Sequence, residues 1–294
     1  MYYLVYIPLY LISLLPLRVL YILSDILAAL LYYVIGYRRK VVMVNLRIAF
    51  PQKSEQELKA IARRFYRNFV DNFIEAIKLF SASPAWIKKH FEVDPAIFDH
   101  LYRKGVRAQL HLGHNFNWEM ANLAVPLYTE FPFLVVYMPI KNKAFDKIFY
   151  KMRSSTGTIL LPATDMKNAM LPFRDQQYLL TLVADQAPGS PSNAYWLNFM
   201  GRPTDFLRGP ERGARAGELA VVFGQIYKVR RGYYKADVEL ATENASELPE
   251  GELTRMYVRF LEKFLHQHPD MWLWSHRRWK HEWKEEYRKW WIGG

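Results

Sequence analysis

The sequence contains no cysteine among its 294 residues. Without a thiol the chain can form neither a disulfide nor a cysteine-linked acyl-enzyme, and thiolate metal sites are excluded as well. It also lacks a Gly-x-Ser-x-Gly string, which weighs against a serine hydrolase built on a nucleophile elbow. The histidines show no spacing typical of metal ligands, so we expect a site without a metal.

Charge is scarce at the start of the chain, where residues 1–36 contain only Arg18 and Asp25. About 20 apolar residues are enough to cross a bilayer, and no small-residue cleavage site ends this run. The pattern therefore predicts a retained membrane-anchoring helix. Residues 19–36 can span alone, with residues 1–17 lying in the interface or forming a second short segment. The alternative is a pair of buried core helices.

Basic residues 38–40 follow the apolar run directly. Positive charge beside a membrane span favours the cytoplasmic side, so the remaining chain is expected in the cytoplasm. The only break in composition lies near residue 40. We therefore predict an anchor at residues 1–40 and one large domain at residues 41–294.

Composition favours a well-packed domain with an anionic partner. Hydrophobic residues make up 51% of the chain and aromatics 16%, so core material is ample and disorder is unfavourable. The formal charge is +12, from 40 Lys and Arg against 28 Asp and Glu. Such an excess indicates nucleic acid, an anionic membrane face or an acidic carrier protein as partner, and composition does not choose among them.

From residue 106 onward, strand-like and helical patterns alternate, which predicts an α/β domain with a mixed sheet flanked by helices. The expected strands are residues 106–112, 133–138, 158–161, 178–184, 225–230, 233–240 and 271–274. The expected helices after the first of these are residues 119–128, 143–155, 165–173, 213–222 and 252–266.

An earlier helix is predicted over residues 55–80, opened by a capping box of Ser54 with Glu57. Its apolar residues recur at spacings of three and four, which indicates a core face. A groove for an acyl chain is the alternative for that stripe: Leu58, Ile61, Phe65, Phe69, Phe73 and Ile77.

The chemistry is expected in the turn at residues 113–119, GHNFNWE, between a strand and a helix. An asparagine at 115 or 117 can cap the new helix, and a carboxylate in its first turn is favoured by the helix dipole. With His114 in the turn and Glu119 in the first helical turn, the two can meet. Glu119 then holds one imidazole nitrogen while the other faces a substrate hydroxyl, and turn amides can supply oxyanion donors.

The string GHNFNWE resembles the His-(x)4-Asp/Glu block of the membrane glycerolipid acyltransferase superfamily, and within it most resembles the lipid A biosynthesis (lauroyl/myristoyl) acyltransferase family. Further blocks of that family occur in the same order at residues 137–142, 183–186, 198–204, 209–210 and 272–280. One departure is Met138, which stands where the family often has an arginine, so no anion contact is expected there.

The resemblance implies a glycerolipid acyltransferase-like fold and transfer of a fatty acyl chain from acyl carrier protein to a hydroxyl of a lipid A precursor, a late secondary acylation. It implies His114 as general base and Glu119 as its orienting partner, without a cofactor or metal. The substrate-binding residues carried over from the family are Asn117, Arg153, Asp185, Gln186 and Arg208. The expected place is the inner membrane, with the catalytic domain facing the cytoplasm and no nucleic-acid partner.

Two other readings remain open. One is an acyltransferase that acts on another glycolipid, an aminolipid or a lysophospholipid. The other, outside enzymes, is a basic membrane-surface protein, which explains the anchor and the charge but not the ordered motifs.

The tail is rich in tryptophan, with six of nine tryptophans between Trp272 and Trp291. Their spacing predicts a helix over residues 276–291 with one aromatic face. Such a face either lies along the membrane surface or packs on the domain.

Overall fold

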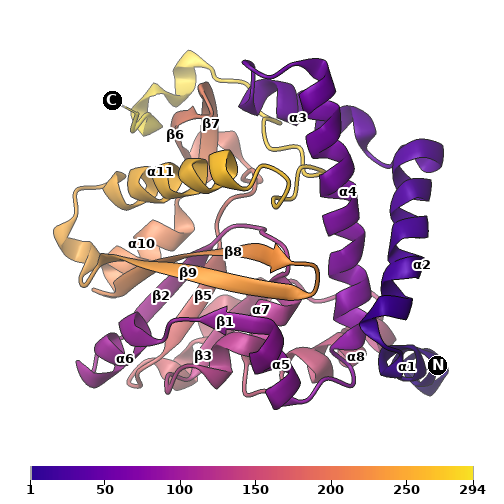
Figure 1. Cartoon of the computed structure of the whole chain (residues 1–294). Helices are drawn as coiled ribbons and strands as arrows, with labels where there is room; N and C mark the ends of the chain where they lie inside the picture. Colours follow the sequence, from indigo (N-terminus) through magenta and orange to yellow (C-terminus); the bar gives the residue numbers. More distant parts are fainter. Residues whose placement is uncertain (1, 294) are drawn as a thin grey trace.

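The computed structural model describes residues 2–293, which form a seven-stranded mixed sheet flanked by helices (Figure 1). The strand order is β1-β9-β8-β2-β5-β3-β4, and every neighbouring pair is parallel except β8 with β9. The strands are β1 Phe91–Val93, β2 Ala108–Leu112, β3 Phe133–Tyr137, β4 Ile159–Pro162, β5 Leu179–Val183, β8 Ala220–Arg230 and β9 Tyr233–Thr242. This confirms the predicted fold class.

Helices connect the strands and cover both faces of the sheet. The α-helices of this part are α5 Pro84–His90, α6 Ala96–Arg103, α7 Trp118–Ala124, α8 Lys143–Arg153, α9 Met166–Ala169, α10 Gly209–Ala216 and α11 Glu252–Gln267. Short 3-10 turns are η2 Val125–Leu127, η3 Ala163–Asp165, η4 Leu171–Phe173, η5 Pro191–Asn193, η6 Ala245–Glu247 and η7 Glu285–Trp290. The predicted helix over 213–222 is wrong in its second half, because residues from Ala220 onward enter the buried centre of the sheet as β8.

A separate hairpin, missed by the sequence patterns, joins β6 Ala194–Phe199 to β7 Arg202–Leu207. Its two turn residues, Met200 and Gly201, both have positive φ, at 51° and 76°. This is the backbone of a tight hairpin turn whose twist matches the strands. A methionine rarely occupies such a position, so the turn carries no clear sequence signal.

Two apolar helices and a π-helical turn begin the chain: α1 Tyr2–Leu14, α2 Leu17–Ala29 and η1 Leu30–Ile35. Residues Leu17–Ile35 are long and apolar enough to cross a membrane, and only 22% of that window is buried. This makes the segment a candidate membrane anchor by length and composition. Its inner face packs along α4, Glu55–Lys78, beside which it runs in Figure 1. The boundary predicted at residue 40 stays a prediction.

The capping box at the start of α4 is confirmed, since the Glu57 amide donates to Ser54 Oγ and the Ser54 amide donates to the Glu57 carboxylate. The first half of its apolar stripe is core, because Leu58, Ile61 and Phe65 are buried. Phe73, by contrast, is 51% exposed, so the predicted core face does not extend unbroken along the helix. Along the chain, α3 (Arg39–Ala49) precedes α4.

The predicted tail helix is wrong. Residues 276–291 are irregular apart from η7, and residues 271–274 make only an isolated bridge, from Trp272 to Asn115. The tail aromatics pack on the β6–β7 hairpin: Trp279 stacks on Phe199, and Tyr287 stacks on Trp196 with ring centroids 5.2 Å apart. The tail aromatics thus make separate contacts with the domain instead of forming one helix face. Trp279, Trp283, Trp290 and Trp291 stay partly exposed, so a membrane contact of the tail stays a prediction.

A buried ion pair fastens this tail. Arg278 is fully buried, and its guanidinium donates to the backbone carbonyl of Asp205 at 2.6 Å and lies 3.5 Å from the carboxylate. His281 Nδ1 contacts the same carboxylate at 2.6 Å. Burial lowers the pKa of Arg278 to about 10, against the raising effect of Asp205.

We predict that Arg278→Met lowers the free energy of unfolding by about 3–5 kcal/mol, because it leaves a buried carboxylate without its cation. Adding Asp205→Leu should recover part of that loss, since the unpaired charge is then gone. Urea unfolding of the detergent-solubilised protein measures both. Strictly additive losses in the double variant would contradict a coupled pair.

Candidate active site

Strand register brings His114 and Asp185 together. β2 and β5 are parallel neighbours with Leu112 opposite Val183. Two residues beyond each strand end, His114 and Asp185 therefore emerge at the same edge of the sheet, where α/β folds place ligand sites. Gly113 permits the approach, because a Cβ there would meet Asp185 Oδ2 at 3.3 Å.

Asp185 accepts three hydrogen bonds. Its Oδ1 lies 2.6 Å from His114 Nδ1, and its Oδ2 accepts from the His114 amide at 2.7 Å and from Trp272 Nε1 at 2.5 Å. The side chain is only 1% exposed. Burial alone would raise the pKa of Asp185, but the His114 imidazole and these donors lower it overall, which keeps the carboxylate ionised.

The other imidazole nitrogen is the one available for chemistry. With the carboxylate at Nδ1, that nitrogen carries the proton and Nε2 presents a lone pair. The amide nitrogen of Gln186 lies 3.0 Å from Nε2, and the His114 side chain is 25% exposed. A histidine held at Nδ1 by a buried carboxylate and partly exposed is the arrangement used to deprotonate a hydroxyl, and here the Gln186 amide donates to Nε2.

The predicted hydrogen bond between Glu119 and His114 is corrected by the structure. Glu119 instead forms a bidentate pair with Arg153, at 2.9 Å from Nε and 2.5 Å from Nη2. Burial would lower the pKa of Arg153, but the bonds to Glu119 raise it overall. Glu119 therefore fixes a guanidinium beside the histidine, and Asp185 orients the imidazole.

Asn117, predicted to bind substrate, has a structural place. It is fully buried, and its Oδ1 caps α7 by accepting from the Met120 amide at 3.1 Å. Its side-chain nitrogen donates to Glu75 at 2.8 Å. Both ends of the amide thus make contacts within the protein, and its substrate-binding role stays a prediction.

Three amides of the turn already have partners. The amides of His114, Asn115 and Phe116 donate to Asp185, to Gly113 O and to Met271 O. The expectation of oxyanion donors therefore does not hold for these three, and it stays a prediction for the amides at the start of α7.

Beside His114 lies an apolar cavity of about 250 Å³. His114, Glu119 and Arg153 supply its titratable and charged side chains at the wall. The rest of the lining is mainly apolar and aromatic: Leu112, Gly113, Trp118, Ala121, Asn122, Val125, Phe133, Val135, Val136, Tyr137, Met138, Leu160, Thr181 and Val183. Of the predicted site residues, three thus share one cavity.

Arg208 lies elsewhere. It lines a different surface hollow together with Arg212 and Arg215, stacks on Trp290 with its guanidinium carbon 3.6 Å from the ring centroid, and donates to Asn193 and Glu250. The structure does not bring it to the cavity beside His114. Its substrate-binding role stays a prediction.

The tail supplies residues that sequence reasoning did not assign to the site. Trp272 donates to Asp185, and His276 Nε2 accepts from the Ala187 amide at 3.1 Å, just after Gln186. Asn45 of α3 holds this segment through the carbonyls of Trp274 and His276. The ordered Trp-x-Trp-x-His block was the available signal, but its partners are distant in the sequence.

The fold and the site thus show an α/β domain in which a histidine, held by a buried aspartate, lies at the wall of an apolar cavity. The chain belongs to the bacterial lipid A biosynthesis acyltransferase family, whose model matches residues 1–281. This confirms the family inferred from the motifs, and it makes the chain an acyltransferase with a lipid acceptor. No curated protein matches the sequence. Within residues 2–293 no three His, Asp or Glu side chains cluster as metal ligands.

We predict that Asp185→Asn lowers kcat for acyl transfer on the order of 10³–10⁴-fold, because an amide at Nδ1 favours the wrong tautomer. Glu119→Gln, which keeps part of the contact with Arg153, should lose far less. Single-turnover rates of the two purified variants make the comparison. A larger loss in Glu119→Gln than in Asp185→Asn would restore Glu119 as the orienting group.

Proposed function

We propose that the protein transfers a fatty acyl chain from the thioester of acyl carrier protein to a hydroxyl of a lipid A precursor. The observation that carries this proposal is the His114–Asp185 pair, with Nε2 free of the carboxylate, at the wall of an apolar cavity. Late secondary acylation, carried over from the family resemblance, is part of the same proposal.

The reaction needs one base and no covalent enzyme intermediate. His114 Nε2 takes the proton of the acceptor hydroxyl as its oxygen attacks the thioester carbonyl, and Asp185 stabilises the imidazolium that forms. When the tetrahedral intermediate collapses, the carbon–sulfur bond breaks and the leaving thiolate takes the proton from Nε2. The Gln186 amide lies 3.0 Å from Nε2 and has a second N–H, which we propose as a donor for the developing oxyanion.

The cavity fits the acyl chain. Its walls are chiefly aliphatic and aromatic, and about 250 Å³ is less than the roughly 300–1,000 Å³ typical of pockets for drug-sized ligands. A single narrow hydrocarbon chain matches such a space, whereas a glycolipid does not. The Arg153 guanidinium, paired with Glu119, lies at the wall of this cavity. In this proposal it lies near the polar headgroup of the acceptor lipid.

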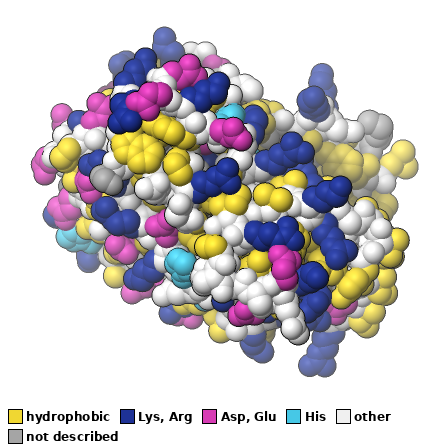
Figure 2. All heavy atoms as spheres, turned by 90° about the horizontal axis from the view of Figure 1, so that it is seen from above, with side chains coloured by type: hydrophobic (Ala, Val, Ile, Leu, Met, Phe, Trp, Pro, Cys, Tyr) yellow, Lys and Arg dark blue, Asp and Glu magenta, His cyan; other side chains and the backbone are white. Residues whose placement is uncertain are grey.

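Membrane and carrier partners fit the distribution of charge and apolar surface. The exposed side chains of α1 and α2 are largely apolar, and a basic hollow formed by Arg38, Arg39, Lys40, Arg47 and Lys59 follows them. Figure 2 shows Lys and Arg side chains over much of the face seen from above. We therefore propose that the N-terminal helices sit in the inner membrane, that the sheet domain faces the cytoplasm, and that the basic side chains meet an acidic carrier protein.

We predict that His114→Ala abolishes transfer while the protein still folds, because the group proposed to deprotonate the acceptor hydroxyl is lost. The matched control is His100→Ala, since His100 is an exposed histidine that pairs with Glu243. Transfer from acyl carrier protein to a lipid A precursor measures the rate, and mass spectrometry of lipid A from cells without the protein should show one acyl chain missing. Wild-type transfer by His114→Ala would refute the mechanism, and intact lipid A with altered phospholipid or aminolipid acylation would redirect the acceptor.

Association with the carrier should weaken with salt. Arg18 and Asp25 cancel, so the chain from residue 37 onward keeps the whole +12 charge. We expect KM for acyl carrier protein to rise steeply as screening shortens to about 3 Å near 1 M salt. Lys40→Gln with Lys59→Gln should raise KM at low salt, whereas Lys263→Gln on α11 should not. A flat salt series, or equal use of acyl-coenzyme A, would count against a carrier-protein donor.

A further inference from the structure

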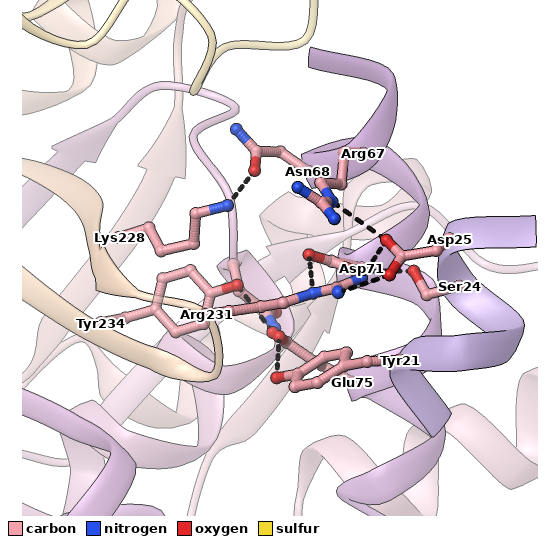
Figure 3. Close-up of polar contacts among 11 residues, drawn as sticks. Tyr21, Ser24, Asp25, Arg67, Asn68, Asp71, Glu75, Lys228, Arg231 and Tyr234 are labelled. Carbon is pink, nitrogen blue, oxygen red and sulfur yellow. Dashed lines mark hydrogen bonds and ion pairs between the residues drawn. The ribbon is translucent and has the colours of Figure 1, made fainter. Parts of the chain in front are cut away.

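A polar cluster, buried at Asp71 and Glu75 and partly exposed at Asp25 and Arg67, joins the N-terminal helix α2 to the catalytic domain (Figure 3). It lies where α2, α4 and the β8–β9 hairpin meet, and its hydrogen bonds and ion pairs connect all three. We call it the junction cluster, and it consists of Tyr21, Ser24, Asp25, Arg67, Asn68, Asp71, Glu75, Lys228, Arg231 and Tyr234.

Glu75 is the member that reaches furthest inward. Its side chain is completely buried, and it accepts from the hydroxyls of Tyr21 and Tyr234 at 2.7 Å each and from Asn117 Nδ2 at 2.8 Å. Tyr21 belongs to α2 and Tyr234 to β9, and Asn117 is the N-cap residue of α7. Burial raises the pKa of Glu75, although its hydrogen bonds act the other way.

Asn117 connects Glu75 to the active-site turn. It is the N-cap of α7, and the helix carries Glu119 two residues later, while His114 lies three residues earlier in the same turn. The Asn117 carbonyl also accepts from the Ala121 amide at 3.1 Å. The bond from Asn117 to Glu75 is therefore a contact that helps to hold the segment between His114 and Glu119.

On the other side, the cluster seats α2. Ser24 Oγ donates to Asp71 at 2.6 Å, and Arg231 bridges Asp71 and Asp25. The hairpin tip fits closely here, because a Cβ on Gly232 would lie 2.5 Å from Tyr21 Oη. Asp71 and Glu75 are one turn apart on α4, so the contacts that seat α2 and the contact that holds Asn117 share one helix face.

Well-packed hydrophobic side chains at this junction would give the protein an equal or higher free energy of unfolding. The reason is that the attraction within a buried ion pair often does not exceed the cost of removing its charges from water. An apolar junction, however, could not accept a hydrogen bond from the Asn117 amide and so could not fix its orientation. We propose that Glu75 is a positioning residue through which the seated α2 holds the catalytic turn, so that acyl transfer depends on α2 lying against α4. This inference rests on the proposed function.

The first experiment reverses the polarity of the contact. Asn117→Asp still caps α7 but sets a carboxylate against Glu75, and kcat should fall on the order of 10²-fold with KM unchanged. Glu75→Gln alone should stay near the wild-type rate, because a glutamine can still accept from Asn117. The double variant restores a donor facing an acceptor and should regain most of the lost kcat. Failure of the double variant to recover, with all variants folded, would overturn the proposal.

The second experiment separates Glu75 from general packing of α2. Tyr21→Phe removes the hydroxyl from α2 that Glu75 accepts, and kcat should fall on the order of tenfold. Ser24→Ala removes an α2 bond to Asp71 without touching Glu75, and it should leave kcat at the wild-type value. Equal losses in both variants would assign the effect to loosened packing and refute a route through Glu75.

A readout independent of transfer keeps this inference distinct from the proposed function. The imidazole NMR signal of His114, assigned by its absence in His114→Ala, should shift in Asn117→Asp and return in the double variant. If the wild type transfers no acyl chain to a lipid A precursor while this pattern holds, the proposed function fails and the positioning role stands. An unchanged signal in Asn117→Asp would overturn the positioning role alone.

Discussion

The buried carboxylate of Asp185 is the constraint on which the active site depends. It accepts from the amide and the ring of His114 and from the indole of Trp272, so β2, β5 and the tail all converge on one side chain. A buried charge is costly unless it is fully paired. Here one of the three donors that meet this cost is the His114 ring itself, so the same contacts stabilise the fold and fix the orientation of the imidazole.

Two carboxylates of the site have separate tasks because their neighbours differ. Asp185 meets a titratable imidazole and an indole, whereas Glu119 meets a guanidinium in a bidentate pair. The first arrangement fixes the orientation of the imidazole, and the second neutralises a charge while fixing the position of Arg153 at the cavity wall. Proteins often assign different work to similar acids through environment alone.

Sequence patterns located the turn at residues 113–119, the strand before Asp185 and the capping box of α4, because each is a local signal. The pairing of His114 with Asp185 instead of Glu119 depends on the register of strands 71 residues apart, which no local pattern contains. The tail was misread for a related reason. Its aromatic spacing fits a helix, but contacts with Trp196 and Phe199 on the distant hairpin give each ring a separate place.

The indole of Trp272 also sets an order of events during synthesis. A growing chain that already contains α2 and the strands holds both His114 and Asp185, yet Asp185 still lacks one of its three donors. In such a chain the proposed base is not yet fully held. Proteolytic cleavage between α11 and Trp272 would cut the covalent link to this donor, so that Asp185 would keep it only through non-covalent contacts of the tail, such as those with Asn45 and Asp205.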